Sequence, residues 1–223
     1  MPSIEWNRLW AKEFVRFSMK PRRKLYGTHW GDPDARGLPY FLQRVRHPFQ
    51  IPGPLYKVVE QYVKPHVKPD RVVLEIGCGG GRWTQYLFGA KKVIAVDING
   101  EFFEALRNRH RKENLEFYQP TACELNGVGD SSVDFVFSFG TFVHIDPDGI
   151  QQYLNEIERV LTPGGTAVIH YSDKRKMVAR LYRGFSNMTG ARMEKMVPIR
   201  IVEHNTSLLH HSNIIVLEKT LKL

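Results

Sequence analysis

The chemically suggestive residues begin in the stretch "VVLEIGCGGGRWTQYL", residues 72–87. An apolar run contains Glu75 and is followed by Gly77 and Gly79, after which a helical pattern begins. Glycine has no Cβ, so the backbone at such positions can pass very close to a ligand. A carboxylate beside this loop is a poor neighbour for a pyrophosphate but a good one for an ammonium group. The spacing therefore predicts a ligand-binding turn between a strand and a helix.

The surrounding pattern indicates the elements that position this turn. Five short strands are expected at "RVVLEI", "KVIAVD", "LEFYQ", "VDFVFSF" and "GTAVIHY", with helices between them over residues 81–89, 101–113 and 149–161. Such alternation, with strands apolar on both faces, predicts a doubly wound, mostly parallel α/β sheet. A helical stretch over 173–196 follows, and "IRIVEHNTSLL" and "SNIIVLEKTL" are expected to form an antiparallel edge hairpin.

The first third of the chain has a different pattern. An apolar stripe at three- and four-residue spacing predicts a helix over residues 4–18, followed by an ordered loop over 26–41 and a second helix over 55–67. We expect residues 1–60 to be a helical extension or lid and residues 61–223 to be the ligand-binding domain. Residues 1–60 carry eleven Lys/Arg and five Asp/Glu, which is +6 of the net charge of +9. A basic arm of this kind can attract nucleic acid, an anionic membrane surface or an acidic substrate, and a solvated face on a soluble enzyme is the alternative.

The composition of the chain narrows the class of protein. The chain has 223 residues, enough for one large domain, and no apolar run of about 18 residues that would predict a membrane span. Its first residues mix charges with tryptophans, unlike a secretory signal. The two cysteines, Cys78 and Cys123, form no CxxC pair, so a disulfide framework is not expected and a cytoplasmic location fits. His204, His210 and His211 do not predict a metal site, because the last two are adjacent and point apart in a strand.

The turn departs from the dinucleotide pattern GxGxxG, since Arg82 falls where its third glycine belongs. "EIGCGGG" instead matches E/D-x-G-x-G-x-G, and resembles the Rossmann-like (class I) S-adenosylmethionine-dependent methyltransferases. "VIAVDIN", "SVDFVFSFGTFVHI" and "YLNEIERVLTPGGTAVIH" continue the resemblance in order over residues 70–172, the last being similar to the ubiquinone/menaquinone branch. This similarity implies S-adenosylmethionine as the cofactor.

The resemblance also implies which residues bind the cofactor. The glycine loop would lie against its methionine part, Glu75 would reach its amino group, Asp97 would bind the ribose and Ile98 would pack on the adenine. Where the family usually has an acid and then an alanine after the third strand, this chain has Thr121 and Ala122. Glu124 is then a candidate for the adenine contact. The implied set of cofactor-binding residues is Glu75, Gly77, Cys78, Gly79, Asp97, Ile98, Thr121, Ala122 and Phe139.

Methyl transfer from a sulfonium is an in-line displacement, so the protein chiefly aligns the nucleophile with the methyl group. A base is needed only for a protonated acceptor. His144, which follows the fourth strand, is the main candidate, since an unperturbed imidazole titrates near ~6.5; a structural role is the alternative. His170 and Tyr171 leave the next strand at the same edge and are further catalytic or acceptor-contacting candidates. His29, Trp30 and Phe142 are expected to contact the substrate.

Three functions remain open. The favoured one is a methyltransferase acting on a small molecule, possibly anionic or aromatic, more at oxygen than at nitrogen. The second is an RNA methyltransferase that uses the basic arm, although no RNA-binding module is recognisable in the sequence. The third is a non-catalytic protein that binds the cofactor, because a fold does not dictate a function. Arg82 and Glu75 disfavour a nicotinamide dehydrogenase.

Overall fold

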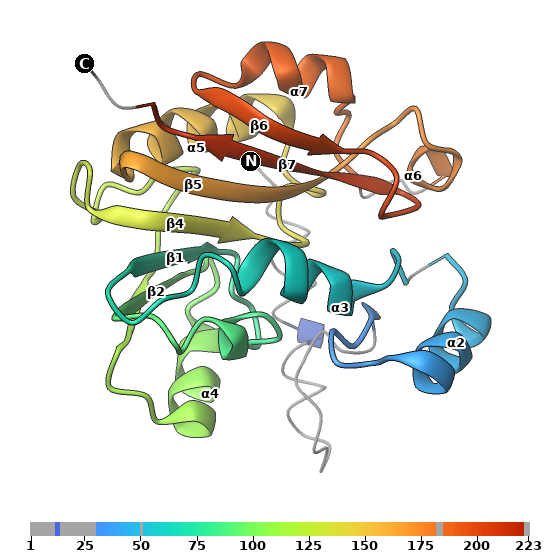
Figure 1. Ribbon diagram of the computed structural model, residues 1–223, viewed down its shortest axis with the longest axis horizontal. Helices are drawn as coiled ribbons and strands as arrows, with labels where there is room; N and C mark the ends of the chain where they lie inside the picture. The colour runs from blue at the N-terminus through green and yellow to red at the C-terminus, as the bar shows by residue number, and fades with distance from the viewer. Residues whose placement is uncertain (1–11, 14–29, 50, 182–184, 221–223) are drawn as a thin grey trace.

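The computed structural model describes residues 12–13, 30–49, 51–181 and 185–220 (Figure 1). Its centre is a seven-stranded sheet in the order β3-β2-β1-β4-β5-β7-β6. The first five strands pair in parallel, and β7 is antiparallel to both β5 and β6. The doubly wound sheet and its antiparallel C-terminal hairpin are thus confirmed. The strands are β1 (Val72–Ile76), β2 (Lys92–Val96), β3 (Leu115–Tyr118), β4 (Val133–Ser138), β5 (Leu161–Ser172), β6 (Arg200–Asn205) and β7 (Ser212–Glu218).

Helices cover the sheet and bury two main apolar clusters. On one face α5 (Pro147–Val160) and α7 (Gly190–Met196) pack against β1, β4, β5 and β7. On the other face α3 (Leu55–Val58), which continues as a π-helical turn over Val59–Val63, packs against β1, β4 and β7. The remaining helices are α2 (Gly37–Arg46), α4 (Glu101–His110) and α6 (Met177–Leu181).

The parallel register brings the functional segments to one edge. β1 lies between β2 and β4, so the turn that follows β1 is flanked by the ends of both neighbours. β7 enters this edge from the opposite direction, with Ser212 paired to Ser172 at the end of β5. The start of β7 therefore lies beside the ends of the parallel strands, where ligands bind in open α/β sheets.

Three sequence predictions differ from the structure. Residues 26–41 were expected to be a loop, but α2 begins at Gly37; Pro39 is tolerated there because the first helical turn has no backbone acceptors for its N–H groups. The helix expected over 81–89 is only a 3-10 turn, Thr84–Tyr86. The stretch 173–196 contains two short helices, and Thr189 caps the second by accepting from the Arg192 N–H (3.3 Å). The helix expected over 4–18 lies outside the described residues except at 12–13, which are helical.

Candidate active site

The glycine turn after β1 is built for close approach. Gly77, Gly79 and Gly81 all have positive φ (79°, 48° and 83°). A Cβ added at Gly79 would meet no atom within 4 Å, so its backbone faces open space. A Cβ at Gly77 would lie 1.8 Å from the Thr141 hydroxyl oxygen, because the segment after β4 is packed onto the turn. Gly79 thus leaves room for a ligand, whereas Gly77 leaves room for the segment after β4.

Asp97 follows β2 and holds the glycine turn. One carboxylate oxygen accepts the Gly79 N–H (2.9 Å) and the other accepts the Asn99 N–H (2.9 Å). The residue is only 8% exposed, and burial raises the pKa of its carboxyl to about 6. Each oxygen has further acceptor capacity, so the carboxylate can also receive hydroxyl groups of a ligand.

Glu75 lies beneath the same turn, on β1. Its carboxylate accepts the Thr84 hydroxyl (2.6 Å), which draws the short 3-10 turn toward the strand. Burial, together with the nearby Asp97 carboxylate, raises the pKa of Glu75 to about 7. No ion pair joins either carboxylate to a described residue. Two buried acids beside an open glycine backbone fit a ligand that carries positive charge and hydroxyl groups, as S-adenosylmethionine does.

The other expected cofactor residues lie around this turn or nearby. Cys78 is buried, and burial raises the pKa of its thiol well above the usual range, so it is a filler rather than a nucleophile. Ile98 is half-buried directly after Asp97. After β3, the Thr121 hydroxyl donates to the Glu124 carboxylate (2.8 Å), which places an acid next to the position where the family usually has one. Ala122 between them is half-buried.

His170 fastens the loop after β4 to β7. Its ring stacks on Phe139 with centroids 3.8 Å apart. Nδ1 accepts the Gly140 N–H (3.0 Å), which leaves Nε2 to donate to the Ser212 hydroxyl (2.6 Å). Burial holds the pKa of His170 well below its usual range. With both nitrogens engaged in a neutral ring, His170 positions its neighbours and is not available to take a proton.

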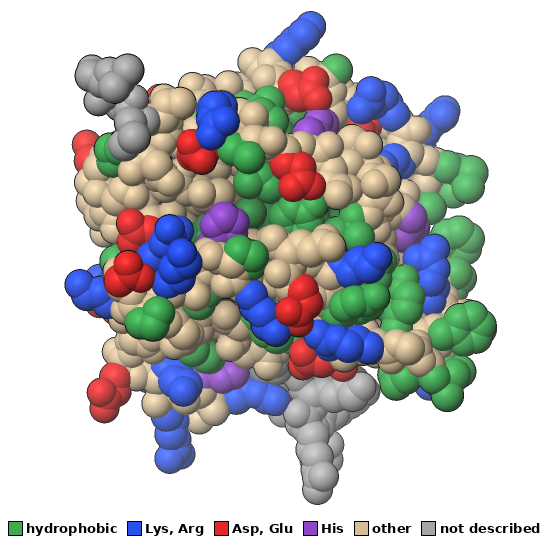
Figure 2. Space-filling view, in the orientation of Figure 1, with side chains coloured by type: hydrophobic (Ala, Val, Ile, Leu, Met, Phe, Trp, Pro, Cys, Tyr) green, Lys and Arg blue, Asp and Glu red, His purple; other side chains and the backbone are tan. Residues whose placement is uncertain are grey.

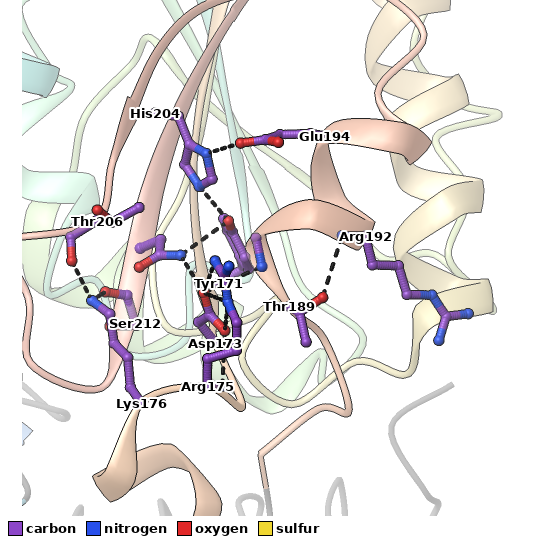
Figure 3. Close-up of polar contacts among 12 residues, drawn as sticks. Tyr171, Asp173, Arg175, Lys176, Thr189, Arg192, Glu194, His204, Thr206 and Ser212 are labelled. Carbon is purple, nitrogen blue, oxygen red and sulfur yellow. Dashed lines mark hydrogen bonds and ion pairs between the residues drawn. The ribbon is translucent and has the colours of Figure 1, made fainter.

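Tyr171 points to the opposite face of β5. It is fully buried, and its hydroxyl contacts His204 Nε2 (2.5 Å) and accepts from the Asn213 amide (3.1 Å). His204 Nδ1 in turn contacts the Glu194 carboxylate (2.6 Å), so the chain of contacts runs outward through β6 to α7 (Figure 3). This network joins the edge hairpin to the sheet. Tyr171 is therefore placed in the core rather than in an acceptor pocket.

Beyond the glycine turn, His144, Phe185 and His211 form a cluster of rings at the carboxyl edge. The Phe185 ring lies 5.6 Å from His144 and 5.1 Å from His211. The segment at 185–186 is held over the loop after β4, since the Ser186 N–H donates to the Val143 carbonyl (2.6 Å). We call these three residues the imidazole cluster.

His211 is the member that sequence reasoning missed. It is 5% exposed, and among the described residues nothing hydrogen-bonds to its Nδ1. Burial, together with the charges of His210 and Lys176, lowers its pKa to about 3. A buried polar atom without a partner is costly and is typical of a site that awaits a ligand. The only sequence signal was a histidine directly before the last strand, which became meaningful once β7 was placed next to β5.

The expected substrate residues are scattered. Phe142 is fully buried in the main cluster, with its ring 5.6 Å from Tyr153, so it supports the loop from below. Trp30 packs against the small cluster that contains Cys78 and Phe102, beside the glycine turn. His29 lies outside the described residues. Arg82 donates to the Gly31 carbonyl (3.3 Å) and lies over the Phe139 ring, 5.8 Å from its centroid.

The sheet order, the glycine turn and the acid after β2 define the class of protein. Residues 73–165 match the family model described as a methyltransferase domain. This part of the chain is thus similar to a methyltransferase domain, and the match supports S-adenosylmethionine as the cofactor. The ubiquinone/menaquinone branch suggested by the sequence is not established by these matches.

Two curated relatives and one solved structure illustrate the similarity. A fatty-acid O-methyltransferase of Mycolicibacterium smegmatis is 35% identical over 46% of this chain and 37% of its own length. A tRNA U34 carboxymethyltransferase of Actinobacillus succinogenes is 36% identical over 49% of this chain and 35% of its own. The chain thus spans little more than a third of either relative. An S-adenosylmethionine-dependent methyltransferase of Methanosarcina mazei superposes with a TM-score of 0.60, at 20% identity, over 73% of this chain and 98% of that one.

Proposed function

We propose that this protein transfers a methyl group from S-adenosylmethionine to an oxygen atom of a small-molecule acceptor. The observation that carries the proposal is the imidazole cluster, in which the buried Nδ1 of His211 lacks a partner. The cluster is adjacent to the cofactor turn, because Thr141 is packed on Gly77 and His144 follows three residues later. This arrangement supports an acceptor site that contains a hydrogen-bonding group and a titratable group.

The residues of the chain would divide the work as follows. When bound, the cofactor supplies the methyl group and its own leaving group. Glu75 and Asp97 would bind its positive charge and its hydroxyls. His211 would fix the acceptor by one hydrogen bond, Phe185 would exclude water, and His144 would take the proton of a hydroxyl acceptor as the new oxygen–carbon bond forms.

The chemistry of the cluster favours an acceptor that is planar or apolar around its oxygen. Asp173, directly after β5, is engaged by Arg175 and by the Asn213 amide (3.0 Å), and interaction with Arg175 and other donors holds its pKa at about 2 despite burial. None of the three residues of the cluster is itself acidic. A carboxylate acceptor, as the name of the Mycolicibacterium relative indicates for that protein, is compatible with such surroundings.

A transfer assay with isotopically labelled S-adenosylmethionine tests this proposal. Purified protein is incubated with a panel of long-chain and aromatic carboxylic acids and phenols, and separately with unmodified tRNA. We expect label in an organic-extractable ester or ether, and we expect His144→Ala to lower turnover while the Kd for S-adenosylhomocysteine changes less than about threefold. Label found only in RNA, or unchanged turnover of His144→Ala on a hydroxyl acceptor, would contradict the assignment.

The second candidate acceptor is RNA. It is favoured by the net charge of +9 and by the similarity to tRNA carboxymethyltransferases. Binding that depends on phosphate contacts must weaken steeply as salt increases. We therefore expect fluorescently labelled tRNA to bind weakly near physiological salt and without a steep salt dependence; tight, steeply salt-dependent binding would move the proposal to an RNA acceptor.

A further inference from the structure

Helix α2 is attached to the protein with its polar side inward. Leu38, Phe41, Leu42 and Val45 lie on one stripe of the helix and are 67%, 61%, 45% and 61% exposed. No residue of α2 is buried, and the half-buried Gln43 on the other side accepts the Asp32 N–H through its amide oxygen (3.3 Å). A helix that packs on its own domain shows the reverse arrangement.

A second element presents apolar side chains on the same flank of the molecule. In α6, Met177 and Leu181 are spaced one helical turn apart and are 69% and 71% exposed, whereas Val178 and Ala179 between them are buried. Phe49, just beyond α2, is 55% exposed. Figure 2 shows apolar side chains gathered on the flank where Figure 1 places α2 and α6. We call this set the α2–α6 face: Leu38, Phe41, Leu42, Val45, Phe49, Met177 and Leu181.

The β6–β7 loop links the two elements through hydrogen bonds. Lys176, directly before α6, donates to the carbonyls of Thr206, Leu209 and Ser212 (2.6 Å each), which anchors the β6–β7 loop (Figure 3). His210 in this loop contacts the Pro52 carbonyl through its backbone N–H (2.8 Å) and through Nδ1 (2.7 Å). The segment after α2 is therefore fixed to the segment before α6, so the face is a continuous feature of the fold.

Basic residues predominate around the α2–α6 face, and two of them are paired with acids at its border, Arg36 with Glu60 and Arg175 with Asp173. Residues 35–59 contain four Lys/Arg and no Asp/Glu, and residues 174–181 also contain four Lys/Arg and no Asp/Glu. Arg44 and Arg46 flank the apolar stripe of α2 itself. An apolar stripe bordered by basic residues is typical of helices that lie in the interface of an anionic membrane, where burial and charge attraction act together.

From these observations we propose that the α2–α6 face docks on the surface of an anionic lipid bilayer. α6 follows β5, so the docked face lies at the edge of the sheet where the glycine turn and the imidazole cluster also lie. An apolar acceptor could then reach the site from the membrane. No described helix is long and apolar enough to cross a membrane, so the contact proposed is with the surface alone.

Co-sedimentation with vesicles tests the proposal without cofactor or acceptor, so its result is independent of the proposed methyl transfer. The probe is phosphatidylcholine vesicles with about 30% phosphatidylglycerol, compared with pure phosphatidylcholine. We expect the wild type to bind the anionic vesicles, to bind the neutral ones less, and to be released by added salt. Val45→Glu should lower the partition coefficient by about tenfold, because it places a negative charge where docking would bury an apolar side chain.

The matched control is Val202→Glu on β6, since Val202 is also exposed (50%) but lies outside the α2–α6 face. We expect it to bind like the wild type, with circular dichroism confirming that both variants are folded. Absence of wild-type binding, or equal loss in both variants, would overturn the proposal. So would light scattering that shows a wild-type dimer and a monomeric Val45→Glu variant, because a second copy of the chain would then cover this face.

Discussion

The two halves of the carboxyl edge bury titratable groups of opposite kinds. Near β1 and β2, burial raises the pKa values of Glu75 and Asp97 to about 7 and about 6. Near β5 and β7, burial lowers the pKa values of His170 and His211. Both sets of pKa shifts favour the uncharged form of the side chains in the free protein. A bound cationic ligand would favour the charged form of the two carboxyls, but not that of the two imidazoles. On the proposed assignment, the half near β1 and β2 would gain charge when the cofactor binds, whereas the half near β5 and β7 would stay neutral and would recognise the acceptor by hydrogen bonds and shape.

The largest expected effect comes from removing the charge at Asp97. Asp97→Asn loses one acceptor oxygen, and therefore a bond to the glycine turn or to the ribose. We expect the Kd for S-adenosylhomocysteine to rise about a hundredfold in calorimetry, because hydrogen bonds to charged groups are worth about 1.5–3 kcal/mol each.

Asp134→Asn is the matched control for Asp97→Asn. Asp134 also accepts two hydrogen bonds, from the Val72 N–H (2.8 Å) and the Thr162 hydroxyl (3.2 Å), but at the amino end of the sheet. It should lose stability without losing affinity. If both variants bind alike, the cofactor half is not at the carboxyl edge.

A smaller effect concerns the pH dependence of stability. The pKa of Glu75 is raised in the folded state, so its contribution is fully present below about pH 4.5 and is lost as pH rises through about 7. Glu75→Gln should remove this loss and raise the free energy of unfolding at pH 8 by about 2 kcal/mol relative to the wild type. Urea unfolding at pH 5.5 and pH 8 measures the difference.

Glu156→Gln should change the free energy of unfolding in the opposite direction. Arg159 holds the pKa of Glu156 below its usual value, so this variant should lose stability at pH 8. If Glu75→Gln instead destabilises the protein at pH 8, the buried carboxylate is compensated in the free protein and the comparison between the two halves fails.

The smallest effect distinguishes the acceptor half. His211→Phe removes a buried Nδ1 without a partner, so the free energy of unfolding should stay constant or rise by about 1 kcal/mol. Methyl transfer should fall about tenfold in kcat/KM, with unchanged affinity for S-adenosylhomocysteine. His66→Phe, at a ring stacked on Phe135 (4.6 Å) near the start of β1, should leave transfer unchanged. Equal transfer by His211→Phe and the wild type would remove His211 from the acceptor site.

The geometry of the glycine turn could be predicted from sequence because its parts are local. Glu75 lies in β1, the glycines follow β1, and Asp97 follows the adjacent β2, so backbone geometry sets their spacing. The acceptor half could not, because His144, Phe185 and His211 come from segments whose proximity depends on β7 pairing with β5. His170 and Tyr171 were correctly placed on one strand, but alternation sends their side chains to opposite faces.

Elsewhere the differences arise from tertiary contacts. The residues after the glycine turn form a 3-10 turn rather than a helix, since Thr84 bonds to Glu75 and Trp83 is buried against Phe139, with ring centroids 4.4 Å apart. α2 was missed because Gly37 and Pro39 suggested a loop, although a proline in the first turn of a helix is compatible with it.

The anchoring of the β6–β7 loop has an evolutionary consequence. Lys176 holds this loop through main-chain carbonyls, which every residue type provides. Side chains along the loop can therefore change while its path is preserved. Substitutions in this hairpin would therefore alter the surface beside His211 while leaving the strands that carry Glu75 and Asp97 unchanged.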